Sequence, residues 1–355
     1  MRHRVLITSP IIPDEGIELL KTACEVSVTP VSGEDELIRE INRFNAEAIY
    51  TRTEKITRRV VESCPGLRII QANGIGIDHI DAAAAAQCGI SVLNVPDVTP
   101  INVAEHAIAL ILALSRHMRT VCRQAAEGGI PYPYPAPLRV QRELEGKTLL
   151  VAGLGNIGRR VAKKALALDM RVLAYDPYVQ GDIMEALGLI PADGLMAALG
   201  DADYVSLHLP DTAQTRHMMD TAQFSAMKED AFFINVSRGS LVNEVALIAA
   251  LQDGKIAGAG IDVFETEPLA LDSPLLSMDN IILSPHCAGT TIGCNIRAAL
   301  RAARSIMDAL CGKDPGTLVN GRQLAQAGRS RSFLLKSEAF KWQMLCNSRT
   351  RRKGP

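Results

Sequence analysis

The sequence predicts an α/β protein built from two doubly wound parallel-sheet domains, and three observations support this. Residues 1–100 alternate short apolar runs with helical segments, the pattern of βαβ units. A second series of apolar runs extends from about residue 148 to residue 283 and begins with a glycine-rich turn. A length of 355 residues also suits two domains of ordinary size.

The first region contains five short apolar runs that read as strands separated by amphipathic segments. The candidate strands are Arg4–Thr8, Glu25–Thr29, Glu47–Thr51, Leu67–Gln71 and Ile90–Leu93. A helix is expected over Glu34–Phe44 with Ser32 as its cap, and Gly89 is expected to end a helix over Asp81–Gln87. This rhythm predicts a small doubly wound, flavodoxin-like domain.

The region from residue 96 to 137 is expected to join the two domains. Pro96 and Pro100 mark a break, after which Asn102–Met118 is predicted to be one long apolar helix at a domain junction or subunit contact. The proline-dense run 130–137, with Tyr132 and Tyr134, cannot be helix or central strand. An extended arm in a protein contact and a plain surface loop are both compatible with this composition.

The segment from Leu149 to Asp176 predicts a dinucleotide-binding Rossmann unit. Its glycines follow G-x-G-x-x-G spacing after an apolar strand and open a helix over about 157–168. The three glycines are Gly153, Gly155 and Gly158. Gly153 would allow the turn, Gly155 the approach of a pyrophosphate and Gly158 close helix–strand packing. Asp176 ends the next strand, where its carboxylate can bind a ribose diol and repel a 2′-phosphate, so NAD is expected.

Three polar side chains follow three later strands of this region, and they predict the catalytic site. The expected strands are Tyr204–Leu207, Phe232–Val236, Ala257–Asp262 and Ile281–Leu283. Arg238, Glu267 and His286 follow the last three of them, so a parallel sheet would bring them to one rim. Histidine titrates near working pH, so His286 suits a general acid/base, and Glu267 could orient it. Arg238 could hold a substrate carboxylate.

Histidine 208 is the competing candidate base. It also follows a strand, in the sequence 208–215, and a lone histidine is more often a satisfied core or surface group. His286 is preferred because Gly289 and two threonines lie beside it and open a helix over about 289–310. That helix could return to the first domain, which would then be discontinuous.

In the first region, two loops at strand ends are candidate anion sites. Arg52 follows a strand directly, and the Asn73–Gly76 loop follows another. Two glycines so close together allow successive backbone N–H groups to face one anion, such as a carboxylate, although two tight turns explain them equally well.

Composition narrows the functional class. The net charge of −1 argues against a general nucleic-acid binder. No C-x-x-C pair occurs among the cysteines, which favours a reducing compartment over disulfides or a zinc site. No signal-peptide pattern or bilayer-length apolar helix is found, so the protein is expected to be cytoplasmic, with no membrane association and no bound metal. The eight cysteines are Cys24, Cys64, Cys88, Cys122, Cys287, Cys294, Cys311 and Cys346.

The segment 321–355 differs from the rest in charge. It holds nine Lys or Arg residues and one acid, Glu338, whereas the preceding residues are net acidic. A dispensable basic tail is expected, with binding of an acidic partner as the alternative.

The motifs together resemble the D-isomer-specific 2-hydroxyacid dehydrogenases over about residues 1–320. The matching segments are the glycine unit with Asp176, then 208–215, 235–244, 260–268 and 284–291. The resemblance implies a Rossmann cofactor domain, 102–286, inserted in a substrate domain, 1–101 plus 287–320. It also implies a homodimer, while the segment after residue 320 is too short for the regulatory domain that some phosphoglycerate dehydrogenases carry.

The resemblance further implies site residues. Arg238, Glu267 and His286 correspond to the family's catalytic set. NAD contacts are implied at Gly153, Gly155, Asn156, Ile157, Gly158, Asp176, Pro210, Thr215, Val236, Ser237, Arg238, Asp262, His286 and Gly289, with Asp262 on the nicotinamide amide. Substrate contacts are implied at Arg52, Asn73, Gly74, Ile75, Gly76 and Arg238.

Three functional hypotheses remain open. The leading hypothesis is hydride transfer between NAD and C2 of a small D-2-hydroxy acid or 2-oxo acid, such as 3-phosphoglycerate, hydroxypyruvate, glyoxylate or a lactate-like acid. The alternative is an NAD-sensing corepressor of the same fold, and a third reading changes the hydride donor to formate or phosphite. Retention of the Arg, Glu and His set favours the first.

Overall fold

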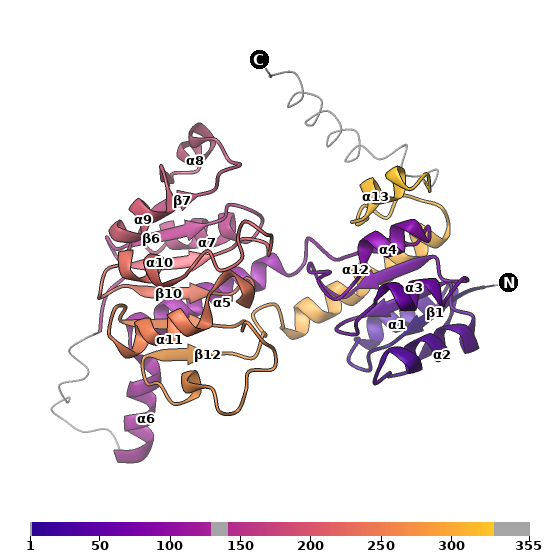
Figure 1. Cartoon of the computed structure of the whole chain (residues 1–355), viewed down its shortest axis with the longest axis horizontal. Helices are drawn as coiled ribbons and strands as arrows, with labels where there is room; N and C mark the ends of the chain where they lie inside the picture. The colour runs from indigo at the N-terminus through magenta and orange to yellow at the C-terminus, as the bar shows by residue number, and fades with distance from the viewer. Residues whose placement is uncertain (1, 129–140, 330–355) are drawn as a thin grey trace. The chain divides into compact units, whose positions relative to one another are not determined.

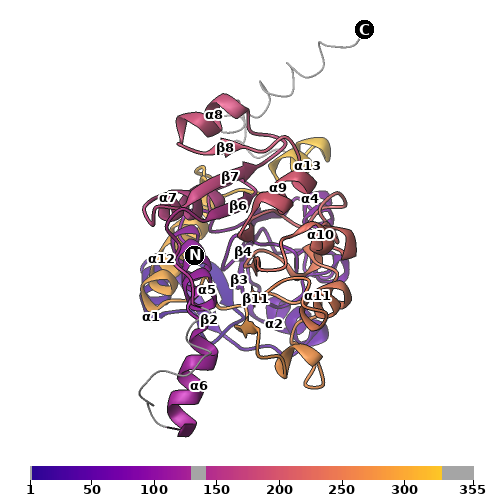
Figure 2. The same ribbon diagram turned by 90° about the vertical axis from the view of Figure 1, so that its left-hand side faces the viewer.

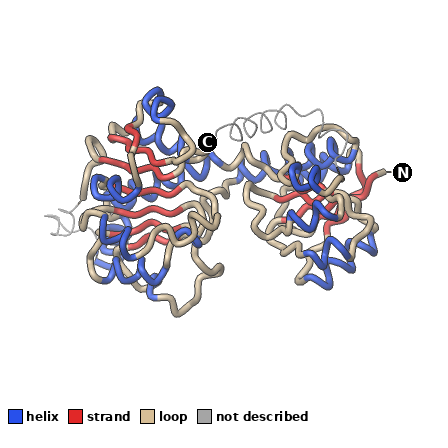
Figure 3. Tube along the Cα trace, turned by 45° about the horizontal axis from the view of Figure 1, so that its top comes forward, coloured by secondary structure: helices blue, strands red, loops and turns tan. Residues whose placement is uncertain are grey.

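The computed structural model describes residues 2–128 and 141–329, which divide into two compact units. The first unit combines residues up to 99 with those from 291 onward, and the second spans 100–290. The expected division, 1–101 with 287–320 and 102–286, differs from these limits by a few residues. Each unit has strands between layers of helices (Figure 3), and the yellow C-terminal helices lie beside the indigo N-terminal elements (Figure 1).

The first unit contains a five-stranded parallel sheet of order β2-β1-β3-β4-β5. The strands are β1 His3–Ile7, β2 Cys24–Val28, β3 Ala48–Thr51, β4 Ile69–Ala72 and β5 Ser91–Leu93. All five predicted strands are confirmed, with shifts of one or two residues at their ends. The runs are apolar on both faces because helices cover both, as expected for a parallel sheet.

The described part of the first unit contains six helices, of which five cover the two faces of the sheet and the last packs on another helix. They are α1 Asp14–Lys21, α2 Glu34–Phe44, α3 Arg58–Glu62, α4 Ala82–Gln87, α12 Ile292–Leu310 and α13 Gly321–Gln326. The α1 and α12 side chains share one core with the sheet, and those of α2, α3 and α4 share the other. A Cβ on Gly16 of α1 would lie 2.6 Å from Ala299 Cβ of α12, so these two helices pack in close contact. The late helix α12 therefore completes the first unit.

Two predictions for the first unit are wrong in detail. Ser32 is not the N-cap of α2: Gly33 takes that place, while the Ser32 amide and hydroxyl both donate to the Glu36 carboxylate at 2.8 Å. The supposed basic tail begins with folded structure, because α13 packs on α4 and buries Leu324 completely beside Ala86. Charge counting missed the single apolar anchor. Residues 330–355 lie outside the described part of the chain.

The second unit contains a seven-stranded parallel sheet of order β12-β11-β10-β9-β6-β7-β8. The strands are β6 Thr148–Ala152, β7 Arg171–Tyr175, β8 Ile190–Pro191, β9 Tyr204–Leu207, β10 Phe232–Asn235, β11 Gly258–Ile261 and β12 Ile281–Leu283. The predicted strands are all confirmed. Only β8 was missed, since two residues with a proline give no periodic signal.

Helices pack on both faces of the second sheet (Figure 2). Side chains of α5 Pro100–Ser115 and α7 Gly158–Leu166 fill one core, and those of α9 Leu195–Asp201, α10 Thr221–Ala226 and α11 Glu244–Gln252 fill the other. A further helix, α8 Gly181–Ala186, precedes β8. This alternation places the carboxyl ends of the strands, and the loops that follow them, on one edge of the sheet.

The predicted helix over Asn102–Met118 is in fact two helices. The first, α5, ends at Ser115, and α6 runs over Met118–Gly128 with no buried residue. His117 between them has a φ of +48°, a left-handed conformation that interrupts the helix although the apolar pattern continues to Met118. The run 130–137 with Tyr132 and Tyr134 lies outside the described residues. No helix in the described ranges is long and apolar enough to cross a bilayer.

Candidate functional site

The glycine turn after β6 has the geometry expected for binding a dinucleotide. Gly153 has a φ of +99°, and a Cβ on it would lie 2.5 Å from the His208 carbonyl oxygen. A Cβ on Gly158 would lie only 1.8 Å from the Gly153 carbonyl oxygen, whereas one on Gly155 would meet nothing within 4 Å. Gly153 and Gly158 are thus required by packing, while Gly155 faces open space. Asn156 and Ile157 lead from this space into α7.

Asp176 lies beside this turn. Its Oδ2 accepts a hydrogen bond from the Leu154 amide at 2.8 Å, and its Oδ1 accepts one from the Tyr178 amide at 2.9 Å. The carboxylate is partly exposed, so its remaining lone pairs can receive hydroxyl groups of a ribose. These contacts fit the adenosine side of NAD.

Arg159 is a functional candidate that the sequence reasoning missed. Its Nε donates to the Leu154 carbonyl at 2.8 Å, and Leu154 is also held by Asp176. The Arg159 guanidinium and the Asp176 carboxylate therefore both bond to the backbone of Leu154. The three residues after Asp176 include no cation, whereas Arg159 lies in the first turn of the helix that follows the glycine turn.

The three predicted catalytic residues follow neighbouring strands whose ends are aligned. Asn235, the last residue of β10, pairs with Ile261 of β11, which pairs with Leu283 of β12. Arg238, Glu267 and His286 follow these strand ends and share one rim. The loop carrying Arg238 is fixed by Asn235, whose amide donates to the Arg238 carbonyl at 2.9 Å and accepts from the Ser237 amide at 3.0 Å.

Two buried residues set the loop between β10 and Arg238. Val236 is 6% exposed and packs into the core of the second unit. The Ser237 hydroxyl donates to the Leu207 carbonyl of β9. The loop therefore binds to the neighbouring strand, which leaves the partly exposed Arg238 as its first side chain at the rim.

His286 and Glu267 form the central pair of this site. The His286 Nδ1 lies 2.7 Å from Glu267 Oε2, and the other carboxylate oxygen accepts from the Phe264 amide at 3.1 Å. The hydrogen bond to Glu267 raises the pKa of His286 against the opposing effect of burial. Burial opposes ionisation of Glu267, yet the bonds from His286 and Phe264 hold its pKa below the usual value. The pair therefore favours a charged imidazolium beside a carboxylate.

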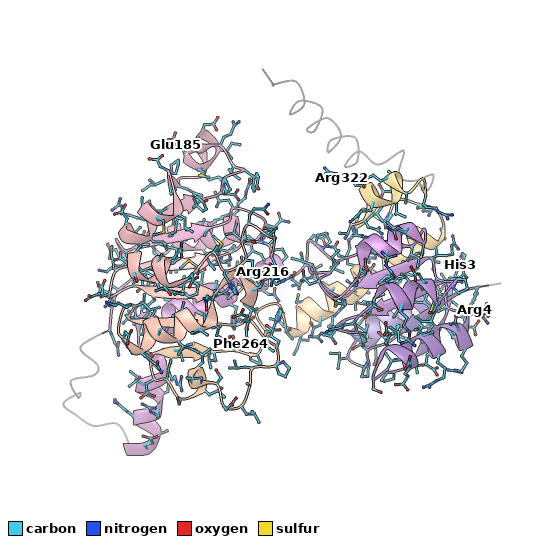
Figure 4. All side chains as sticks on the ribbon, viewed as in Figure 1. His3, Arg4, Glu185, Arg216, Phe264 and Arg322 are labelled. Carbon is cyan, nitrogen blue, oxygen red and sulfur yellow. The ribbon has the colours of Figure 1, made fainter. Side chains whose placement is uncertain are left out.

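Arg238 lies within electrostatic reach of this pair. Its positive charge lowers the pKa of both Glu267 and His286, and its Nη1 donates to the Ser237 carbonyl at 2.7 Å. The side chains of His286 and Glu267 are 52% and 36% exposed, so a substrate can reach the free imidazole nitrogen. Phe264 and Arg216, labelled in Figure 4, lie on loops that follow β11 and β9 of this sheet.

His208 is poorly suited to proton transfer. Its Nε2 bonds to the Ser206 hydroxyl at 2.9 Å, and its Nδ1 is buried without a partner among the described residues. Burial lowers the pKa of His208 to about 3. A ring that burial keeps neutral argues for His286 as the base. Further along this loop, the Thr215 hydroxyl donates to the Pro210 carbonyl at 2.6 Å and closes the segment next to the glycine turn.

Asp262 is enclosed at the end of β11. It is 1% exposed, and its carboxylate accepts from the Ser284 hydroxyl at 2.6 Å and from the Cys287 and Ala288 amides at 2.9 Å. Gly289 follows this loop directly, and Thr291 caps α12 by accepting from the Cys294 amide. The surroundings of Asp262 are therefore those of a residue that organises the loop of His286.

The two predicted anion loops of the first unit follow the neighbouring strands β3 and β4, and the Asn73 amide donates to the Thr51 carbonyl at 3.0 Å. The Asn73 Oδ1 accepts a hydrogen bond from the Tyr50 hydroxyl, and the Ile75 carbonyl accepts from the Asn94 amide at 2.9 Å. Within the described ranges, the backbone N–H groups of Gly74, Ile75 and Gly76 donate to no protein acceptor. Such a loop has the unpaired donors that an anion needs.

Arg52 lies on the other loop. Its backbone amide donates to Glu54 Oε2 at 2.9 Å, and the same oxygen accepts from the Thr51 hydroxyl at 2.6 Å. The Arg52 guanidinium makes no ion pair within the described ranges and is partly exposed. It therefore remains available to a ligand.

The fold and the rim define a class: a two-unit α/β protein with a Rossmann-type nucleotide turn and a histidine–carboxylate pair on the same sheet. Residues 108–288 match the family model described as "D-isomer specific 2-hydroxyacid dehydrogenase, NAD binding domain". The chain belongs to the D-isomer-specific 2-hydroxyacid dehydrogenase family, and its similar relatives are named as dehydrogenases and reductases.

Several relatives are similar over most of this chain. A D-3-phosphoglycerate dehydrogenase of Archaeoglobus fulgidus is 37% identical over 89% of the chain, which spans only 59% of that relative. A glyoxylate reductase of Thermofilum pendens is 37% identical over 90% of the chain and 95% of its own length. The structure of an NADPH-dependent glyoxylate/hydroxypyruvate reductase of Sinorhizobium meliloti with NADP and malonate has a TM-score of 0.81 at 28% identity, covering 91% and 98% of the two chains.

Proposed function

We propose that this chain transfers a hydride between NAD and C2 of a small D-2-hydroxy acid or its 2-oxo acid. The observation that carries the proposal is the 2.7 Å His286–Glu267 pair with Arg238 at the same rim as the glycine turn. NAD would supply the hydride chemistry. The residues of this chain would bind the acid and handle the proton.

The proposed roles follow from charge. In the reducing direction, protonated His286 gives its proton to the C2 oxygen, and Glu267 stabilises the imidazolium before that transfer. Arg238 holds the substrate carboxylate by a two-pronged bond and polarises the C2 oxygen. Arg52 and the amides of Gly74, Ile75 and Gly76 are proposed to contact anionic groups of the same substrate.

NAD is proposed as the preferred cofactor because Asp176 can bind a ribose diol and repels a 2′-phosphate. The proposed contacts run from the glycine turn through Asn156, Ile157 and Asp176 to the rim. The remaining proposed contacts are Pro210, Thr215, Val236, Ser237, Arg238, Asp262, His286 and Gly289. Arg159 is the group of this chain that would favour NADPH instead. The Sinorhizobium enzyme named above is NADPH-dependent.

The substrate candidates are those of the similar proteins together with lactate-like acids. A panel of glyoxylate, hydroxypyruvate, 3-phosphohydroxypyruvate and pyruvate, assayed by NADH and NADPH absorbance, tests the proposal directly. Turnover of one acid with NADH is expected. Binding of NADH without turnover of any acid would instead support the corepressor-like alternative.

A homodimer is also proposed, with the α5–α6 face as the contact. Met118, Val121, Cys122 and Ala125 lie at helical spacing on α6, and Met118 is 44% exposed. A cavity of about 530 Å³ adjoins this stripe and is lined partly by Leu276, Ile282 and Leu283. Light scattering of the intact chain, compared with a Met118→Glu variant, should show a dimer and a shift toward monomer.

The free cysteines of the described chain accord with the proposed cytoplasmic location.

A further inference from the structure

The loop that carries His286 is built around the side chain of Asp262. His286 has a φ of +50°, which a residue with a side chain adopts only when its surroundings hold it there. Its amide donates to the Asp262 carbonyl at 2.8 Å and to the Ser284 carbonyl at 3.1 Å. The Asp262 carboxylate in turn accepts from Ser284, Cys287 and Ala288, on both sides of His286. The position of the imidazole thus depends on one buried carboxylate.

A histidine on helix α5 completes this arrangement. His106 Nε2 lies 2.9 Å from the Ser284 hydroxyl oxygen and 3.7 Å from Asp262 Oδ1. An ionised carboxylate can only accept, so the Ser284 hydroxyl donates its single proton to Asp262. The Ser284 oxygen must then accept from His106, which requires a proton on His106 Nε2. The chain of bonds runs from His106 through Ser284 to Asp262.

Helix α5 is a firm support for this chain. Ala104, Ala107 and Ile108, the close neighbours of His106 on α5, are buried, and α5 packs against α7, β10, β11 and β12. His106 itself is 26% exposed in its side chain. Its ring therefore reaches the loop after β12 from a well-packed helix.

These same atoms do not form a convincing metal site. The donor atoms of His106, Asp262 and Cys287 lie within 4.8 Å of one another. The imidazole nitrogen and both carboxylate oxygens already take part in hydrogen bonds within the protein. Burial and the nearby Asp262 charge raise the pKa of Cys287, which disfavours the thiolate that a metal requires. The cluster is better described as a hydrogen-bonded brace.

We propose that His106 and Ser284 are positioning residues for His286: the hydrogen bonds from His106 to Ser284 and from Ser284 to Asp262 hold the strained loop that sets the imidazole against Glu267. This inference rests on the proposed function, in which His286 transfers the proton. His106 touches neither substrate nor cofactor in this proposal. Its contribution is the direction and firmness of the loop.

The proposal predicts a specific change in proton transfer. His106→Leu removes the donor, so the loop relaxes and the His286–Glu267 bond weakens. We expect kcat for 2-oxo acid reduction to fall ~10- to 100-fold, since a misplaced general acid costs that much, while NADH affinity stays the same. The groups that face His286 are Glu267, Arg238 and Asp262, and those that face Asp262 are His106, Ser284 and Cys287.

The pH profile separates positioning from a general loss of stability. The bond to Glu267 raises the pKa of His286, so weakening it lowers that pKa toward its ordinary value. The alkaline limb of kcat/KM for reduction should therefore move to lower pH in His106→Leu and in Ser284→Ala. His106→Gln keeps an N–H near the same place and Ser284→Thr keeps the hydroxyl, so both should restore the limb. The double variant should be no worse than the poorer single one.

Glu105→Gln is the matched control. Glu105 is the neighbour of His106 on α5, is exposed and pairs with Lys164, so its loss should change neither kcat nor the pH limb. The proposal is overturned if His106→Leu lowers only the melting temperature, or if His106→Gln is as impaired as His106→Leu. Should His106→Leu fail to fold, Ser284→Ala and the two conservative variants carry the same comparison.

Nuclear magnetic resonance titration of the His286 ring gives a readout that needs no substrate. The His286 signal is assigned by its absence from His286→Gln, and its pKa is compared between wild type and Ser284→Ala. If the wild-type chain reduces none of the 2-oxo acids, the proposed function fails, but the titration still decides whether the brace controls His286. An unchanged His286 pKa in Ser284→Ala would contradict the brace alone.

Discussion

His286 and Glu267 act as one unit, and their titration should be read that way. The 2.7 Å contact couples the two groups, so pH profiles report apparent values for the pair. The hydrogen bond raises the pKa of His286 and lowers that of Glu267. Both shifts favour the proton on the imidazole, where reduction of a 2-oxo acid needs it.

Replacing His286 should remove most of the catalytic rate. His286→Ala leaves no acid for the C2 oxygen, so kcat should fall ~10²- to 10⁴-fold with NADH binding unchanged. Stopped-flow NADH oxidation with parallel fluorescence binding measures both quantities. Full activity in this variant would move the proton-transfer role elsewhere, against the buried, low-pKa character of His208.

Reduction by the wild type should fall as pH rises. The proton is needed on His286, whose pKa is raised above its model-compound value of 6.5. The rate should therefore persist above that pH and decline at higher pH, and hydroxy-acid oxidation should show the opposite limb. In Glu267→Gln, the largest cause of the raised pKa is lost, so the decline should move to lower pH. A profile that does not move would contradict the pairing.

Arg238 should affect both substrate binding and rate. Arg238→Ala removes the proposed partner of the substrate carboxylate, so KM should rise and kcat should fall, together ~100-fold or more in kcat/KM. Arg238→Lys keeps the charge without the fork and should recover only part of the loss. Steady-state kinetics with the best acid of the panel measures the split, and an unchanged KM would exclude carboxylate binding by Arg238.

We expect cofactor choice to depend on Asp176 and Arg159. Asp176→Ala removes the repulsion of a 2′-phosphate, so kcat/KM with NADPH should rise relative to NADH by at least ~10-fold. Arg159→Ala should shift the ratio the other way if its guanidinium attracts that phosphate. Equal ratios in wild type and Asp176→Ala would remove the physical basis for the NAD preference.

Among the elements, the glycine turn and helix α13 show how far sequence patterns reach. The turn was predicted because strand, glycine spacing, helix and acid occur in a fixed order, and the close approach of Gly158 to Gly153 explains that order. The sequence did not indicate helix α13 because its six residues contain one large apolar residue, Leu324, and so show no helical periodicity. Its single leucine, Leu324, is buried only because α4 and Leu318 pack against it in the folded chain.

Truncation distinguishes the folded start of the C-terminal segment from the rest. A chain ending at residue 329 should keep the stability of the first unit, whereas one ending at 320 loses α13. Leu324→Ala should cost ~2–4 kcal/mol, since a fully buried leucine leaves a cavity. Urea denaturation followed by hydrogen exchange of α4 measures the effect, with Arg322→Ala on the same helix as the control. Equal stability of the 320 and 329 chains would show that α13 adds nothing.

At the scale of the whole molecule, the chain passes from one unit to the other near residues 99 and 291, and each unit contains different candidate site residues. The second unit contains the glycine turn, Asp176 and the catalytic candidates, whereas Arg52 and the Asn73–Gly76 loop belong to the first. The second unit is continuous in sequence and has its own two-sided core. It is therefore expected to fold by itself.

A fragment of residues 100–290 tests this division. It should show cooperative thermal unfolding and bind NADH within ~10-fold of the intact chain, but reduce no 2-oxo acid, because the proposed anion-binding groups of the first unit are missing. Fluorescence of bound NADH and absorbance assays measure these outcomes. Appreciable turnover by the fragment would show that the first unit is not needed for substrate binding.

The sequence by itself determined the parallel α/β class, nearly all the strands, the nucleotide turn and the three polar residues of the rim. These depend on local patterns: apolar runs, glycine spacing and side chains placed directly after strands. The tertiary structure decided what depends on contacts between distant segments. These include the break at His117, the burial of Leu324, the bonds of both Arg159 and Asp176 to the Leu154 backbone, and the hydrogen bond from His106 to Ser284. No periodicity encodes such contacts, because the partners are brought together only when strands and helices pack.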